Sequence, residues 1–210
     1  METRADGSHG QLEDTLDSWP VASSDVQLSD RIISVRRDRV QMPDQDYAER
    51  TVVTHPGAVA VLALDEQDRV LMIRQYRHPV GRLLWEIPAG LRDAAGESPL
   101  ATAERELLEE ANCRAGRWHT LVDYFSSPGY STERIRVFLA RDLEPVPDTG
   151  YERHHEEKFL VTEWVPLHDA VRLALDGKLH NGPAITGVLA GYAAWSEGFS
   201  SLRPAGAPET

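Results

Sequence analysis

Residues 90–113 read GLRDAAGESPLATAERELLEEANC, a polar loop followed by one strong helix pattern. Ser98 suits the N-cap, Pro99 suits the first helical position, and Asn112 can adopt the left-handed conformation that ends a helix. These signals predict a helix between Ser98 and Asn112. At about 100° per residue the helix has one apolar stripe, which we expect to pack on a sheet. The stripe consists of Leu100, Ala103, Leu107 and Ala111.

The same helix carries three carboxylates away from the apolar stripe. Glu106 and Glu110 are four residues apart and Glu109 is three from Glu106, so the three share one patch. A cluster of carboxylate oxygens without His or Cys suits a hard divalent cation such as magnesium or manganese. Taken alone, the helix is equally compatible with a solvated acidic face.

The spacing of this segment resembles the Nudix box, a loop-helix-loop motif. The matching residues are Gly90, Glu97, Arg105-Glu106 and Glu109-Glu110. Two departures occur: the interval from Gly90 to Glu97 is one residue longer than usual, and Asn112 stands where the box has glycine. The insertion falls in a loop, asparagine tolerates positive φ, and neither departure affects a metal-ligand position. The resemblance implies an α+β fold, the Nudix α/β/α sandwich with a mixed sheet, preceded by a small N-terminal antiparallel sheet.

Segments outside the box resemble the ADP-ribose pyrophosphatase branch, especially its bacterial members, over residues 31–200. They are Gln75-Tyr76-Arg77, the run Trp85-Glu86-Ile87-Pro88-Ala89-Gly90, and Ser127-Pro128-Gly129 with Ser131 and Glu133. The branch has a proline about fifteen residues past the box, and Pro128 takes that position. The resemblance implies magnesium-dependent hydrolysis of ADP-ribose to AMP and ribose 5-phosphate, with manganese a possible substitute. The alternatives are another nucleoside diphosphate sugar or dinucleotide as substrate, or a non-catalytic ligand-binding regulator.

The resemblance also implies roles for individual residues. The expected metal ligands are the backbone carbonyl of Ala89 and the side chains of Glu106, Glu109, Glu110 and Glu157. The expected catalytic residues are Glu157 as base, Glu156 as the second choice, and Glu109 assisting. The expected substrate-binding residues are Arg50, Arg77, Pro128 and Gly129; for the two arginines, an ordinary surface position is the alternative. Glu97 and Arg105 are expected to pair and hold the loop on the helix, and His154 and His155 to be ordinary loop residues.

Periodicity and turn residues divide the 210-residue chain into four parts. Residues 1–27 are expected to form an acidic, mobile tail, and residues 28–50 a small sheet that is exchanged in a homodimer. Residues 51–200 form the expected Nudix domain, and residues 201–210 a loose end. Further helices are predicted at residues 168–176 and 183–195, with strands at 58–64, 69–76, 83–87, 118–125, 135–140 and 159–165.

Composition limits the partners of this chain. The formal net charge is -12, which disfavours nucleic acid because no basic patch is evident. No apolar run is long enough to cross a bilayer, and the first residues lack the pattern of an export signal. The single cysteine, Cys113, cannot form an internal disulfide, so we expect a cytoplasmic protein with no membrane partner.

Overall fold

Strand β4 (Ala58–Ala63) lies inside the main sheet of the computed structural model, which describes residues 13–147 and 158–209. The strand order of this sheet is β11-β8-β9-β4-β7. Its other members are β7 (Ala89–Leu91), β8 (Cys113–Phe125), β9 (Arg134–Pro145) and β11 (Arg203–Pro204). Strand β4 is parallel to β9 and antiparallel to β7, so the mixed sheet predicted from the sequence is confirmed.

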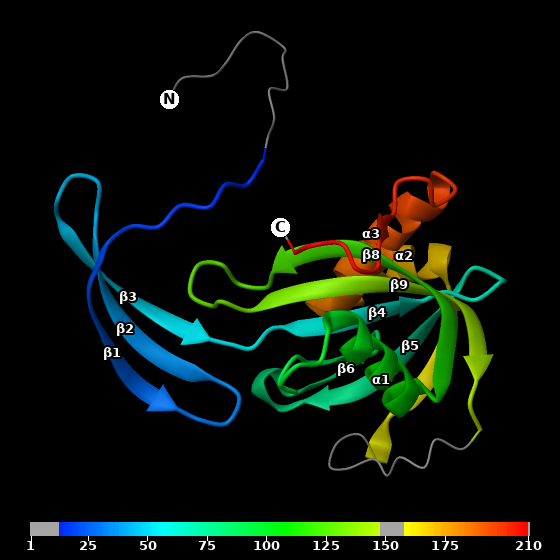
Figure 1. The fold of residues 1–210 in the computed structure, drawn as a ribbon. Helices are drawn as coiled ribbons and strands as arrows, with labels where there is room; N and C mark the ends of the chain where they lie inside the picture. The colour runs from blue at the N-terminus through cyan, green and yellow to red at the C-terminus, as the bar shows by residue number, and fades with distance from the viewer. Residues whose placement is uncertain (1–12, 148–157, 210) are drawn as a thin grey trace, which may run out of the picture.

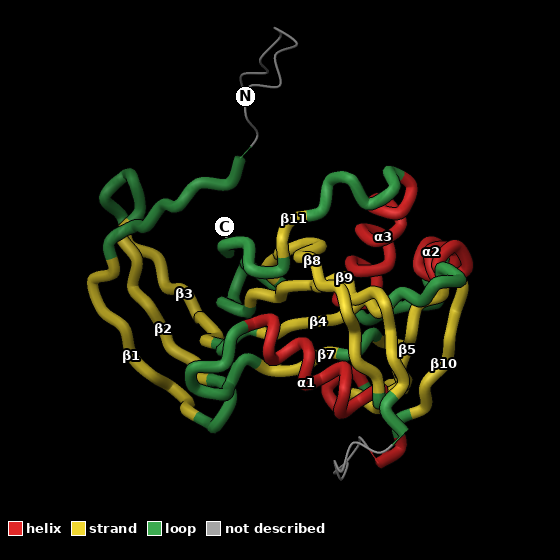
Figure 2. Tube along the Cα trace, turned by 45° about the vertical axis from the view of Figure 1, so that its right-hand side comes forward, coloured by secondary structure: helices red, strands yellow, loops and turns green. Residues whose placement is uncertain are grey.

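Helices cover both faces of the main sheet (Figure 1; Figure 2). On one face, Ala60 and Leu62 pack in a core with α2 (Leu167–Leu175) and α3 (Gly182–Ser196). On the other face, Val59 and Val61 pack with α1 (Pro99–Ala111). Successive side chains of a strand point to opposite faces, so the uninterrupted apolar run in β4 suits a strand that is buried on both sides. The predicted α/β/α sandwich is confirmed, and α2 and α3 each begin one residue before the predicted position.

A second sheet lies just before β7 and the loop that leads into α1 in the chain. Its strand order is β10-β5-β6, and all pairs are antiparallel. The strands are β5 (Arg69–Arg77), β6 (Arg82–Glu86) and β10 (Val161–Pro166), and the 3-10 helix His78–Val80 joins β5 to β6. Only Ile87 and Pro88 separate β6 from β7, so this sheet leads directly into the loop before α1.

The N-terminal sheet consists of three antiparallel strands and stands beside the sandwich (Figure 1). The strands are β1 (Val21–Ser29), β2 (Ser34–Gln41) and β3 (Tyr47–Thr54). The small antiparallel sheet is confirmed, but the prediction of a mobile tail through residue 27 is wrong for residues 21–27. These residues form β1 by pairing with β2 although all nine β1 residues are exposed. Backbone pairing does not require an apolar pattern, so the polar composition concealed the strand.

The C-terminal end differs from the predicted loose segment. Arg203 and Pro204 pair with Thr120 and His119 of β8, and Glu209 forms an ion pair with Arg92. Backbone pairing and one ion pair to a distant arginine hold this end, and neither contact leaves a periodic signal in residues 201–210. In the part of the chain that the structure describes, no helix is both long and apolar enough to span a membrane.

Candidate active site

Both ends of α1 are fixed by the residues that the sequence indicated. The Ser98 side chain accepts a hydrogen bond from the backbone N–H of Ala101 at 3.2 Å, which satisfies a free donor of the first turn. Asn112 adopts φ 50° and ψ 45°, the left-handed conformation expected at the end of a helix. The predicted caps are confirmed: Ser98 caps the start of α1, and Asn112 ends it in the place where the motif has glycine.

An ion pair joins the preceding loop to α1. The Arg105 guanidinium donates to both oxygens of the Glu97 carboxylate at 3.2 Å, and the Thr102 hydroxyl donates to the same carboxylate at 2.9 Å. These hydrogen bonds from Arg105 and Thr102 hold the pKa of Glu97 below its usual range. The expected structural pairing of Glu97 and Arg105 is therefore present.

Arg105 also contacts the acidic face of α1. Its Nη1 lies 2.7 Å from Glu106 and 3.2 Å from Glu109, so one cation draws these two carboxylates together. Glu106 packs against Gly90 so closely that any Cβ at Gly90 would collide with its carboxylate. A side chain at position 90 would therefore displace the Glu106 carboxylate from this position.

Glu110 is the buried member of the three carboxylates. It is 6% exposed and accepts a hydrogen bond from the backbone N–H of Ala89 at 2.9 Å. Burying a carboxylate is costly unless it is hydrogen-bonded or paired, so this contact fixes Glu110 beside β7. The structure thus brings the backbone of Ala89 and Gly90 to the acidic face of α1.

Arg77 points toward a buried carboxylate that the sequence analysis did not select. Its Nε and Nη2 donate to the two oxygens of Glu86 at 2.8 and 2.6 Å, and Glu86 is only 1% exposed. Such a bidentate pair fixes the orientation of the guanidinium. The sequence signal was available, because Glu86 is the one charged residue between Leu83 and Ile87.

The remaining expected substrate residues lie where the N-terminal sheet meets the sandwich. Arg50 is an exposed residue of β3, and Pro128 and Gly129 belong to the loop between β8 and β9. The end of β3 pairs with this loop: Val53 donates to the carbonyl of Tyr130 at 2.8 Å and accepts from Thr132 at 3.0 Å. Arg50 therefore comes from a strand that is attached to the Pro128–Gly129 loop, whereas Arg77 comes from β5. Glu156 and Glu157 lie outside the described residues, as do His154 and His155.

A family model described as NUDIX domain matches residues 54–186, from the end of β3 into α3. The chain belongs to the Nudix family. It is 46% identical over 182 residues to an ADP-ribose pyrophosphatase of Mycobacterium tuberculosis (87% of this chain, 86% of the relative). It is 34% identical over 159 residues to an ADP-ribose pyrophosphatase of Bacillus subtilis (76% and 84%).

Two further comparisons concern substrate range and fold. The chain is 31% identical over 154 residues to a GDP-mannose pyrophosphatase of Yersinia pestis (70% of this chain, 75% of the relative). A crystal structure of an ADP compounds hydrolase has the same Nudix fold, with a TM-score of 0.72 and 20% identity. The match covers 90% of this chain and 99% of that one.

Nudix hydrolases generally use divalent metal ions, and the donor set of α1 suits such an ion. Glu106, Glu109 and Glu110 supply hard oxygen ligands, and Glu106 is packed directly on the backbone of Gly90. Within residues 13–147 and 158–209, however, no three His, Cys, Asp or Glu side chains are placed to hold a metal together. Arg105 neutralises the negative charges of Glu106 and Glu109 in this arrangement. We therefore expect these two side chains to rotate away from Arg105 when a cation binds.

Proposed function

We propose that this Nudix enzyme hydrolyses the pyrophosphate bond of ADP-ribose to AMP and ribose 5-phosphate, with Mg²⁺ as the cation and Mn²⁺ as a substitute. One observation carries the proposal: a buried Glu110, tied to Ala89, shares a helix face with Glu106 and Glu109. The 46% identity to an ADP-ribose pyrophosphatase supports the choice of substrate.

The proposed cation site consists of Glu106, Glu109, Glu110, the carbonyl of Ala89 and Glu157. When bound there, a divalent cation neutralises phosphate charge and lowers the pKa of an attacking water. Glu157 is the proposed base that accepts the proton of that water, with Glu156 as the alternative and Glu109 assisting. General-base assistance of this kind contributes typically about 10²- to 10⁴-fold in rate.

The proposed substrate contacts come from Arg50, Arg77, Pro128 and Gly129. Arg77 presents a guanidinium whose orientation is fixed by Glu86 and whose side chain is 42% exposed, so its outer edge can bind phosphate oxygens. Arg50 is exposed on β3, and the β8–β9 loop carries Pro128 and Gly129 to the end of that strand. These positions suit a substrate that lies between the N-terminal sheet and the acidic face of α1.

Substrate specificity can be tested on the purified full-length protein in saturating Mg²⁺. ADP-ribose, GDP-mannose and a dinucleotide are each incubated with the enzyme and a phosphomonoesterase, and released phosphate is measured. We expect the highest kcat/KM for ADP-ribose. A clear preference for GDP-mannose would overturn the proposed substrate, and binding of ADP-ribose without hydrolysis under any divalent cation would favour the regulator.

We further propose that the chain is a cytoplasmic homodimer that associates through the N-terminal sheet. All nine residues of β1 are exposed, and they include Val21, Val26 and Leu28, with exposures of 53–66%. A small sheet gains stability in water when its apolar side chains are covered, so cover from a second copy accounts for these residues. A single species with the mass of a monomer at micromolar concentration in sedimentation would contradict the dimer.

A further inference from the structure

The C-terminal segment covers buried polar side chains of the main sheet. Arg136 of β9 is 3% exposed, and its guanidinium pairs with both oxygens of Asp123 on β8 at 2.7 and 3.0 Å. The same guanidinium donates to the carbonyls of Ala207 and Pro208 at 2.7 and 3.1 Å. Buried polar groups need hydrogen-bond partners, and here the C-terminal backbone provides them. The segment is therefore fixed to the sheet by a buried group.

The last described residue continues from this anchor to the loop before α1. Glu209 lies 2.7 Å from the Nη1 of Arg92, in a pair whose two side chains are each 24% exposed. The backbone N–H of Arg92 donates to the carbonyl of Gly57 at 3.1 Å, just before β4. Arg92 follows β7, the strand that carries Ala89 and Gly90, by one residue. Glu209 thus joins the C-terminal segment to the chain that presents these two residues to Glu110 and Glu106.

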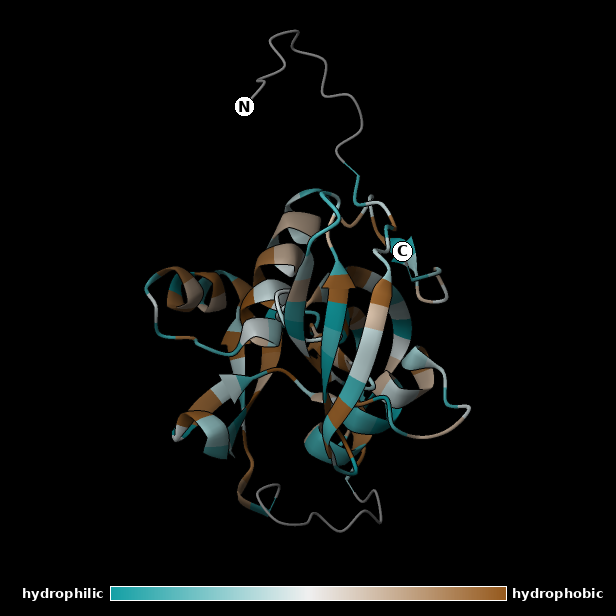
Figure 3. Cartoon of the chain, turned by 90° about the vertical axis from the view of Figure 1, so that its left-hand side faces the viewer, coloured by the Kyte–Doolittle hydropathy of each residue, from teal (hydrophilic) through white to brown (hydrophobic). Residues whose placement is uncertain are grey.

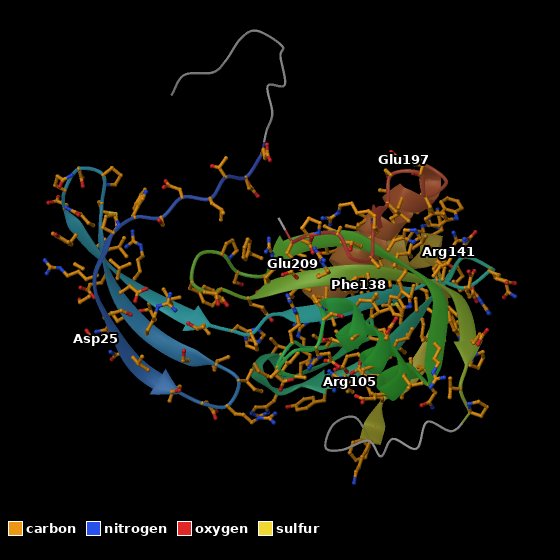
Figure 4. The ribbon with its side chains drawn as sticks, in the orientation of Figure 1. Asp25, Arg105, Phe138, Arg141, Glu197 and Glu209 are labelled. Carbon is orange, nitrogen blue, oxygen red and sulfur yellow. The ribbon has the colours of Figure 1, made fainter. Side chains whose placement is uncertain are left out.

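Packing between the C-terminal segment and α1 is incomplete. A cavity of about 420 Å³ lies between the first turn of α1, at Ser98 and Pro99, and the segment at Ala205 and Ala207. Arg92 and Glu209 also line this cavity. Beside this cavity, the Arg92–Glu209 ion pair connects the segment to the loop before α1. Figure 4 labels Glu209 near the C-terminal end of the chain and Arg105 on α1.

We propose that residues 203–209 form a C-terminal clamp in which Glu209 is a positioning residue. Glu209 holds Arg92, and Arg92 holds the Ala89–Gly90 part of β7 against the acidic face of α1. The clamp thereby sets the spacing between the Ala89 backbone and the three carboxylates of the proposed cation site. This inference rests on the proposed cation site but not on the identity of the substrate.

The test is a calorimetric titration of the full-length protein with Mn²⁺ alone, without any substrate. Glu209→Gln and Arg92→Gln should each weaken Mn²⁺ binding by about tenfold, the lower end for groups that orient metal ligands. Arg92→Lys, which keeps a cation beside Glu209 and leaves the contact of Glu209 with Arg136 intact, should retain most of the affinity. Glu197→Gln, an exposed change at the end of α3, is the matched control and should bind Mn²⁺ as the wild type does.

Thermal unfolding of the same variants separates positioning from general support. A lower unfolding temperature with unchanged Mn²⁺ affinity in Glu209→Gln would overturn the proposal, as would an Arg92→Lys variant that binds Mn²⁺ as weakly as Arg92→Gln. A wild type that binds Mn²⁺ but fails to hydrolyse ADP-ribose would contradict the proposed function and leave the clamp intact. A wild type that hydrolyses ADP-ribose, with Glu209→Gln binding Mn²⁺ normally, would contradict only the clamp.

Discussion

Strands β4 and β1 are both paired in sheets, yet they differ completely in burial. Residues 59–63 of β4 are fully buried, because helices lie on both faces of the main sheet. Every residue of β1 is exposed, and Figure 3, in which the N-terminal sheet faces the viewer, displays hydrophilic and hydrophobic segments along its strands. Strand β4 is thus covered within one chain, whereas β1 leaves Val21, Val26 and Leu28 exposed, and the proposed dimer would cover them. Changes in the sandwich should therefore act inside one chain, and changes in β1 should act on association.

The largest effect is expected from Asp123→Asn in the sandwich. This change removes the nearer carboxylate partner of the buried Arg136 guanidinium and leaves Glu209 at 3.9 Å, and breaking a buried pair costs about 3–5 kcal/mol of unfolding free energy. Urea denaturation at pH 7 measures the loss. Asp142→Asn is the matched control, because Asp142 and Arg117 form an exposed pair on the same two strands, and it should change stability little. Equal losses in the two variants would mean that burial does not distinguish these pairs.

The same carboxylate predicts a pH dependence. Burial of Asp123 favours its neutral form, but hydrogen bonds and charges from Arg136 and Arg203 outweigh burial and hold its pKa below the usual range. A depressed pKa stabilises the fold above the unfolded value of about 3.9, and this stability is lost as the pH falls through the folded value. The stability difference between wild type and Asp123→Asn should therefore be constant near neutral pH and shrink below about pH 4. A difference that grows on acidification would contradict the assigned pair.

Next in size is the effect of Glu110→Gln on catalysis. The substitution keeps the shape and the contact with Ala89 but removes a charged oxygen ligand, so kcat/KM in Mg²⁺ should fall by about 100-fold or more. Glu104→Gln is the control on the same helix, because Glu104 is exposed and lies away from the acidic face. Steady-state hydrolysis of ADP-ribose provides the measurement. Normal turnover of Glu110→Gln in saturating Mg²⁺ would remove Glu110 from the cation site.

A smaller effect, of a different kind, is expected in β1. Leu28→Asp replaces an exposed apolar side chain, and burial of a leucine at an interface contributes about 1.5–3 kcal/mol. The dimer dissociation constant should rise by at least about tenfold, while the unfolding free energy of the sandwich is unchanged. Gln27→Asp introduces the same charge at the adjacent position and is the control. Sedimentation velocity over a concentration series measures both variants, and identical profiles would exclude β1 from the interface.

The features that could be predicted from the sequence are those that depend on residues close together in the chain. Ser98 and Asn112 end α1 through contacts within one turn, and the apolar run of β4 is visible in the chain itself. Strand β1, by contrast, depends on β2, and Arg203 depends on a strand more than eighty residues earlier, so neither has a local signal. The acidic face of α1 could be placed by helical periodicity alone. Its contact with Ala89 required the fold, because the two residues meet only across β7 and α1.

The smallest expected effect concerns Glu86, whose pairing with Arg77 joins two strands of the second sheet. Glu86→Gln keeps the size of the side chain but leaves one acceptor oxygen and no charge, so Arg77 loses its bidentate partner. If Arg77 binds the substrate phosphates, KM for ADP-ribose should rise by about tenfold, because one charge-assisted contact contributes about 1.4 kcal/mol or more. The kcat value should change little, since the acidic face of α1 is untouched. Glu163→Gln, an exposed change on neighbouring β10, is the control and should leave both constants unchanged.

Separate measurement of KM and kcat distinguishes a loss of Arg77 orientation from a general loosening of the second sheet. A variant that merely loosens the second sheet would lower kcat and the unfolding temperature together, because β6 leads directly into β7, which carries Ala89. A rise in KM alone, with unchanged unfolding temperature, requires that Glu86 acts through the orientation of Arg77. Since this pair lies inside one chain, the rise should also persist in the Leu28→Asp background, where association is weakened. A KM effect that appears only in the dimer would instead place Arg77 at a site shared between the N-terminal sheet and the sandwich.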